Sequence, residues 1–152
     1  MDKINIQEKA KPQPGRIEKY LFENENIGLK KTLFHRIYVP LSPFDSGLDY
    51  VDQPEETEIV FEWFSLNLKD PDNLNGLNLN HKNYPDAEAS VYVGSAHNWC
   101  NINKLIISNI EENRFQINVD LEIDFEAEGV ASNETLTFQT EVLLNKDVYD
   151  ET

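Results

Sequence analysis

Alternation of apolar and polar residues is clearest in the last third of the chain. Residues 115–128 read FQINVDLEIDFEAE, with apolar side chains at odd positions and polar or acidic side chains at even positions. A period of two is typical of a β-strand with one buried and one solvated face. We therefore predict one long strand over residues 115–128.

The neighbouring segments predict an antiparallel meander around this strand. Apolar and β-branched runs at residues 90–94, 102–110 and 135–144 are separated by short polar turns. The apolar positions of residues 135–144 are even-numbered, so paired residue numbers in the final hairpin must sum to an odd value. This register places four residues beside the carboxylates: Thr135, Thr137, Gln139 and Glu141. On the other side, one of two possible phases brings Lys104 toward Glu122.

The first half of the chain has a weaker pattern. Residues 16–23 favour a short helix and residues 32–40 a strand, whereas residues 57–68 are apolar in both phases, which is typical of a central strand covered on both faces. Residues 70–86 form a long Asn- and Asp-rich loop, a kind of segment that often carries function. The predicted fold is mainly β, with α+β as the alternative, and has at most one or two short helices.

Length and composition predict one cytoplasmic domain. A chain of 152 residues is long enough for a single core, and its one cysteine excludes an internal disulfide. Residues 1–15 are polar and rich in lysine and proline, so we expect a flexible arm followed by a globular domain over residues 16–152. This start lacks the apolar run of a signal peptide, and no later apolar segment is long enough to cross a membrane.

The net charge of −15 constrains the class of partner. Residues 1–36 hold 8 Lys and Arg against 5 Asp and Glu, whereas residues 111–152 hold 2 against 12. An acidic surface disfavours nucleic acid and anionic membranes, whose binding depends on lysine and arginine. It favours a basic protein partner and accelerates the encounter with it.

The predicted partner-binding residues are the carboxylates of the last two strands. They are Asp120, Glu122, Asp124, Glu126, Glu128 and Glu141. Neighbouring carboxylates about 6.7 Å apart along a strand repel weakly, and the whole row costs on the order of 1 kcal/mol. Solubility alone is therefore a sufficient explanation of the row. No metal or cofactor site is predicted, because side chains spread along one strand cannot converge on one ion.

A second cluster, Ser95, His97 and Cys100, raises the alternative of an enzyme. The segment lacks the Gly-x-Ser-x-Gly pattern of a nucleophile elbow and has no identifiable acid partner for His97. We interpret it as a Gly-Ser turn between strands, with Trp99 packed in the core.

In its size, its acidity, its lack of a catalytic motif and its acidic run at residues 120–128, the chain resembles bacterial immunity proteins that inhibit basic nuclease-type toxins. The resemblance implies a non-catalytic inhibitor whose acidic surface occupies the toxin's nucleic-acid cleft. Residues 70–86 are a second candidate contact. Two other functions remain open: a small-ligand or carbohydrate-binding β-domain, and an enzyme centred on residues 95–100.

Overall fold

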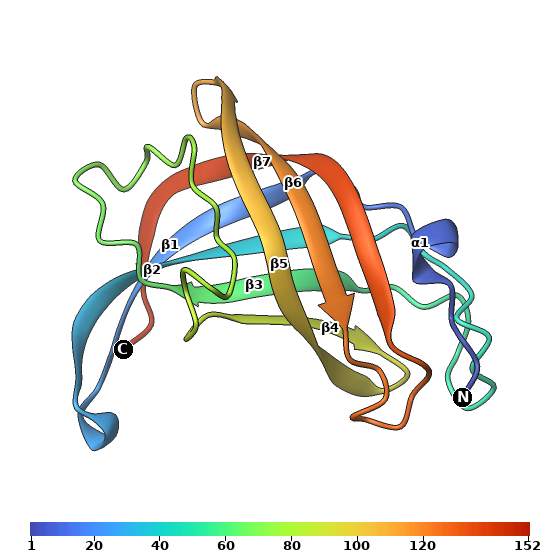
Figure 1. The fold of residues 1–152 in the computed structure, drawn as a ribbon. Coiled ribbons are helices and arrows are strands. Elements are labelled where there is room, and N and C mark those ends of the chain that lie inside the picture. Colours follow the sequence, from blue (N-terminus) through green and yellow to red (C-terminus); the bar gives the residue numbers. More distant parts are fainter.

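The computed structural model describes residues 1–152 as a closed barrel of seven strands (Figure 1). The strands are β1 (Gly15–Asn24), β2 (Leu29–Pro40), β3 (Glu58–Phe64), β4 (Glu88–Val93), β5 (Ala96–Glu111), β6 (Arg114–Ile123) and β7 (Glu134–Asp150); the helical turns are α1 (Ile6–Lys9) and the 3-10 turn η1 (Glu25–Ile27). Consecutive strands pair antiparallel, and β7 closes the barrel by pairing in parallel with β1. The predicted mainly β domain with a C-terminal meander is confirmed. No helix is long and apolar enough to cross a membrane.

The helix predicted for residues 16–23 is wrong, because this segment forms β1. Its many Glu, Lys and Arg side chains are typical of a helix surface, yet β2 and β7 pair with its two edges. Ile17 enters the core, and the buried Lys19 is neutralised by an ion pair with Asp72. An inward lysine hides the alternation that would otherwise have revealed the strand.

The long strand predicted for residues 115–128 is correct only as far as Ile123. Residues 124–133 form the turn to β7, in which Phe125 is fully buried although it lies outside any strand. The Asp124 carboxylate accepts the Ala127 N–H at 3.1 Å, which closes a local turn. The alternation therefore continues past the point where a partner strand exists.

The predicted register of the final hairpin is confirmed. Val119 lies opposite Phe138 and Leu121 opposite Leu136, so the paired numbers sum to an odd value. The β6 carboxylates Asp120 and Glu122 lie opposite the uncharged Thr137 and Thr135 of β7, whereas Glu141 lies opposite Gln116. Lys104 of β5 lies opposite Asp120 and not opposite Glu122, the residue that one of the two predicted phases would bring close to it.

A bulge in β3 explains why residues 57–68 are apolar in both phases. Ile59 and Phe61 point into the barrel, and Trp63 then adopts a positive φ of 66°. This extra residue shifts the register against β2 and returns Phe64 to the interior. The strand is therefore buried on one face only, and the prediction of a strand covered on both faces is wrong.

The Asn-rich segment at residues 70–86 completes one wall of the barrel. β4 is short, so the second half of β5 has no strand on that side. Asparagine side chains replace the missing carbonyl groups: Asn78 Oδ1 accepts the Leu105 N–H at 3.1 Å, and Asn75 Oδ1 accepts the Asn109 N–H at 2.8 Å. The composition of the segment thus has a structural cause.

The N-terminal segment, expected as a flexible arm, packs against the barrel. Ile4 and Ile6 are buried in the core. The Glu134 carboxylate holds the start of α1, because it accepts the N–H groups of Ile4, Asn5 and Ile6 at 2.9–3.0 Å. Two apolar residues in a polar context were the only sequence signal for this docking.

Candidate functional site

The structure separates the six predicted carboxylates into three groups. Asp120 and Glu122 point outward from β6, whereas Asp124, Glu126 and Glu128 belong to the turn that follows. Glu126 accepts the Asn133 N–H at 3.0 Å, so its carboxylate stabilises that turn. The sixth residue is Glu141 of β7; its carboxylate contacts Arg114 at 3.4 Å, toward the opposite end of β6. The carboxylates do not form one row.

Trp99 lies at the centre of the outer surface that β3, β4 and β5 form. Val60 pairs with Ser90, and Ser90 pairs with Trp99, which places the three side chains in one row across β3, β4 and β5. Half of the Trp99 side chain is exposed, so the prediction that it packs in the core is wrong. It lies at an outward position of β5, next to the inward Cys100.

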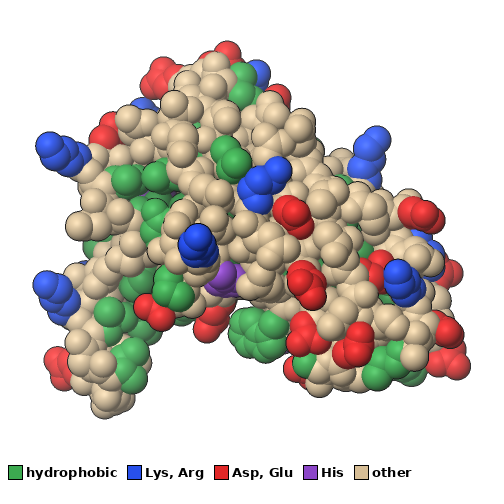
Figure 2. Space-filling view, viewed as in Figure 1, with side chains coloured by type: hydrophobic (Ala, Val, Ile, Leu, Met, Phe, Trp, Pro, Cys, Tyr) green, Lys and Arg blue, Asp and Glu red, His purple; other side chains and the backbone are tan.

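Two hollows flank Trp99. A groove of about 730 Å³ lies on its β3 side and is lined by Glu56, Glu58, Glu62, Tyr92 and His97, among others. A hollow of about 350 Å³ lies on its β6 side and is lined by Glu122, Asp124 and Asn133. An exposed indole therefore has carboxylates on both sides. In Figure 2, acidic side chains gather at the lower right, over the lower ends of β5 and β6.

We call this surface the acidic face. Its residues are Glu56, Glu58, Glu62, Glu88, Tyr92, Trp99, Glu122 and Asp124. Our sequence analysis identified only Glu122 and Asp124 as partner-binding residues. Glu58 and Glu62 have a period of two around the inward Ile59 and Phe61, which is a signal that the bulge at Trp63 obscured.

Two like charges face each other at the last pair of the β3–β4 ladder, where β4 begins. Glu62 lies directly opposite Glu88 in the antiparallel register. Partial burial raises the pKa of Glu62, and the nearby Glu88 carboxylate raises it further. Like charges at such positions destabilise a sheet by roughly 0.2–1 kcal/mol. Neither carboxylate has an ion-pair partner within 4 Å.

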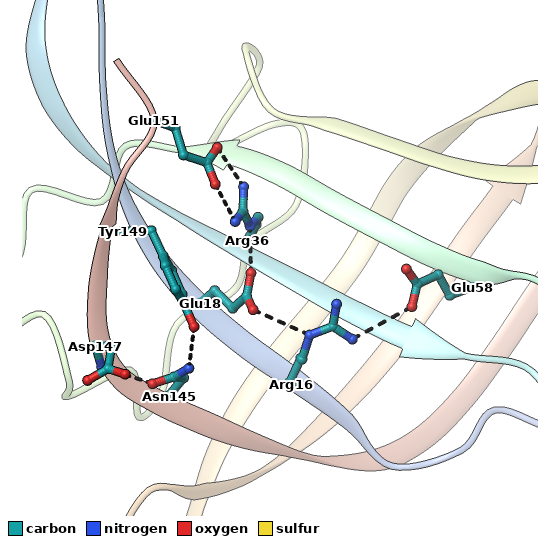
Figure 3. A network of polar contacts seen from close by, with 8 residues as sticks. All are labelled: Arg16, Glu18, Arg36, Glu58, Asn145, Asp147, Tyr149 and Glu151. Carbon is teal, nitrogen blue, oxygen red and sulfur yellow. Dashed lines mark hydrogen bonds and ion pairs between the residues drawn. The ribbon is translucent and has the colours of Figure 1, made fainter.

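On the adjacent surface of the barrel, which β1 and β2 form, arginines neutralise the carboxylates. In Figure 3 an ion-pair network crosses β1 and β2, from Glu151 through Arg36, Glu18 and Arg16 to Glu58. The network reaches the acidic face only at Glu58, whose oxygen lies 3.8 Å from Arg16. Two of the three arginines of the chain thus neutralise carboxylates on this side of the barrel.

The cluster proposed for an enzyme is dispersed by the strand geometry. Ser95 lies in the Gly-Ser turn between β4 and β5, as predicted. His97 is exposed beside the Tyr92 ring, with 4.8 Å between ring centres, whereas Cys100 is buried on the opposite face of β5. Burial raises the pKa of the Cys100 thiol to about 12. These residues therefore form no nucleophile–base pair.

No group of three or more His, Cys, Asp or Glu side chains is arranged to hold a metal ion. No known protein family, characterised protein or solved structure matches the chain.

Proposed function

We propose that the protein is a non-catalytic binding protein whose acidic face holds a basic protein partner. The observation that carries the proposal is the half-exposed Trp99 between two groups of carboxylates that, except for Glu58, have no ion-pair partner. Tryptophan is enriched among the residues that contribute most to binding at interface centres, and polar or charged residues are found mainly at the rim around them. Carboxylates on a rigid sheet also need little reorganisation before they bind arginine or lysine.

The partner that best fits this surface is a basic, nuclease-type toxin. A nuclease cleft is lined by cations that contact phosphates, and a rigid set of carboxylates can occupy the positions of those phosphates. Inhibition then consists of occupying the cleft without any chemical reaction, which is the mode of action that the resemblance to immunity proteins implies. It requires no cofactor, and it uses the net charge of −15 to accelerate association.

The test is capture of a basic partner, either from the source cell or as the product of the adjacent reading frame. The association rate should fall steeply with salt concentration. The triple variant Glu62→Lys, Glu88→Lys and Glu122→Lys should slow association at least about tenfold, because it reverses the charge of the acidic face.

A matched control reverses three exposed carboxylates outside the acidic face: Glu23, Glu25 and Asp147. Both triple variants change the net charge equally, so a local interface predicts a large effect only for the first. Equal association rates for the first variant and the wild-type protein would contradict the proposed face. Trp99→Ala should instead accelerate dissociation, because it removes the central apolar contact.

A carbohydrate-binding role is the second candidate, favoured by the exposed Tyr92 and Trp99 rings along the 730 Å³ groove. Aromatic rings and carboxylates together can hold a neutral sugar. Oligosaccharide binding would be lost in Trp99→Ala and would be insensitive to salt. Salt dependence therefore separates the two functions.

A further inference from the structure

A second concave site lies at one end of the barrel, between the β1–β2 hairpin and the segment before β4. We call it the end pocket. It has a volume of about 570 Å³, and its walls include Leu29, Phe34, Trp63, Tyr84 and Asp86. Its size and its largely apolar lining lie within the range of small-molecule sites. It shares no residue with the acidic face.

The end pocket exists because β3 stops pairing with β2. β2 pairs with β1 from Leu29 onward, but its pairing with β3 begins only at His35. One wall of the pocket is therefore an unpaired strand edge. The segment from Tyr84 to Ala87 contributes further lining residues of the pocket.

Trp63 is held in this pocket at a conformational cost. Its φ of 66° is rare for a bulky residue and is unfavourable for an L side chain. The backbone N–H of Trp63 donates to the buried Tyr20 hydroxyl at 3.0 Å, and the indole ring packs edge-to-face on Phe34 with ring centres 5.3 Å apart. These contacts fix the indole at the pocket wall.

The charge of the end pocket selects the class of ligand. Asp86 is the only charged side chain in its lining, and no lysine or arginine contributes. Three aromatic rings, those of Phe34, Trp63 and Tyr84, accompany this carboxylate. Ring faces and one carboxylate attract an organic cation, whereas they repel an anion. The strongly negative net charge raises the local concentration of cations further.

We propose that the end pocket binds a small organic cation, a quaternary or alkylated ammonium group with an apolar substituent. The ammonium group lies against the aromatic rings and Asp86, and the apolar substituent contacts Leu29 and the strand edge. Function of this site is independent of partner binding at the acidic face.

The experiment titrates the full-length protein with benzyltrimethylammonium and follows the two indole N–H signals by NMR. The Trp63 signal should shift with saturation, while the Trp99 signal, on the acidic face, should stay constant. Asp86→Asn should weaken binding about tenfold, because it removes the charge and keeps the shape. The control Glu25→Gln, at the tip of the β1–β2 hairpin, should leave the affinity unchanged.

Two further probes, one uncharged and one negatively charged, complete the test. Benzyl alcohol and benzoate should bind much more weakly than the cation. Equal binding of benzyl alcohol would overturn the assignment of a cation site, and an unchanged Trp63 signal at saturating probe concentration would overturn the site itself. Because Asp86 is exposed and makes no ion pair, its substitution tests binding without threatening the fold.

Discussion

Carboxylates on two sides of the same barrel have different environments. On the β1–β2 side, Glu18 has a side chain only 14% exposed and contacts both Arg16 and Arg36. Arg36 also forms a two-pronged contact with Glu151, and its guanidinium lies 4.5 Å from the Tyr20 ring. Each desolvated charge there is neutralised, which is what a structural ion-pair network requires.

The acidic face lacks this neutralisation even where burial would call for it. Glu62 is half-buried and lies opposite Glu88, yet the nearest arginines are engaged with other carboxylates. A protein gains no stability from this arrangement. The network is therefore explained by folding, whereas the acidic face is better explained by a cation supplied from outside.

Removal of the central cation of the network should destabilise the protein most. Arg36→Met should lower the free energy of unfolding by about 2–3 kcal/mol, because it leaves the nearly buried Glu18 without its closest partner at 2.8 Å. The midpoint of urea unfolding measures this change.

The double variant Arg36→Met and Glu18→Gln serves as the control for that prediction. Removal of both charges should recover much of the lost stability, because no unpaired charge remains buried. If Arg36→Met alone were as stable as the wild-type protein, the two sides of the barrel would not differ in the way we describe.

A smaller loss is expected at Glu134, whose carboxylate accepts three backbone N–H groups of the N-terminal segment. Glu134→Gln should cost about 1–2 kcal/mol, because an amide is a weaker and partly mismatched acceptor. Hydrogen exchange should become faster at Ile4 and Ile6. Glu128→Gln, in an exposed turn, is the control and should change neither property.

On the acidic face, removal of a carboxylate should stabilise the protein instead of destabilising it. Glu62→Gln should raise the free energy of unfolding by about 0.5 kcal/mol at neutral pH, because it removes repulsion from Glu88. In the wild-type protein the raised pKa of Glu62 means that the folded state keeps its proton longer than the unfolded state. Stability therefore falls as pH rises above the ordinary value of 4.5 toward the folded pKa.

Urea midpoints at about pH 4 and about pH 7 measure that pH dependence. The contribution of Glu62 to the fall should be absent from Glu62→Gln. A variant less stable than the wild-type protein at neutral pH would show that Glu62 has a structural partner, and the acidic face would then resemble the network.

The sequence predicted the C-terminal half of the fold better than the site. Alternation in β6 and β7 is local, so the pattern alone determined their register. β1 was predicted as a helix because its inward Lys19 depends on Asp72, which is remote in the sequence. The acidic face depends on pairing among β3, β4 and β5, and the bulge at Trp63 changes which residues point outward. Which of these residues share the outer surface is therefore determined only by the tertiary structure.

The smallest effect is expected for a pair that has good geometry but no burial. Lys31 and Asp150 lie 2.7 Å apart and are exposed. Hydrogen bonds from Lys31 and Thr152 lower the pKa of Asp150 to about 2. A depressed carboxyl pKa contributes stability above the unfolded value, and this contribution is lost as pH falls through about 2. Solvent and salt screen the interaction at neutral pH.

Lys31→Ala should therefore lower the urea midpoint only slightly at physiological salt, because the pair is exposed and screened. The same substitution should raise the pKa of Asp150 toward its ordinary value of 3.8, which an NMR titration of the carboxyl group measures. A raised pKa with only a slight loss of stability would show that ion pairing alone does not distinguish the two sides of the barrel. Burial then decides which pairs hold the fold, and the unneutralised burial of Glu62 becomes the sharper mark of a binding surface.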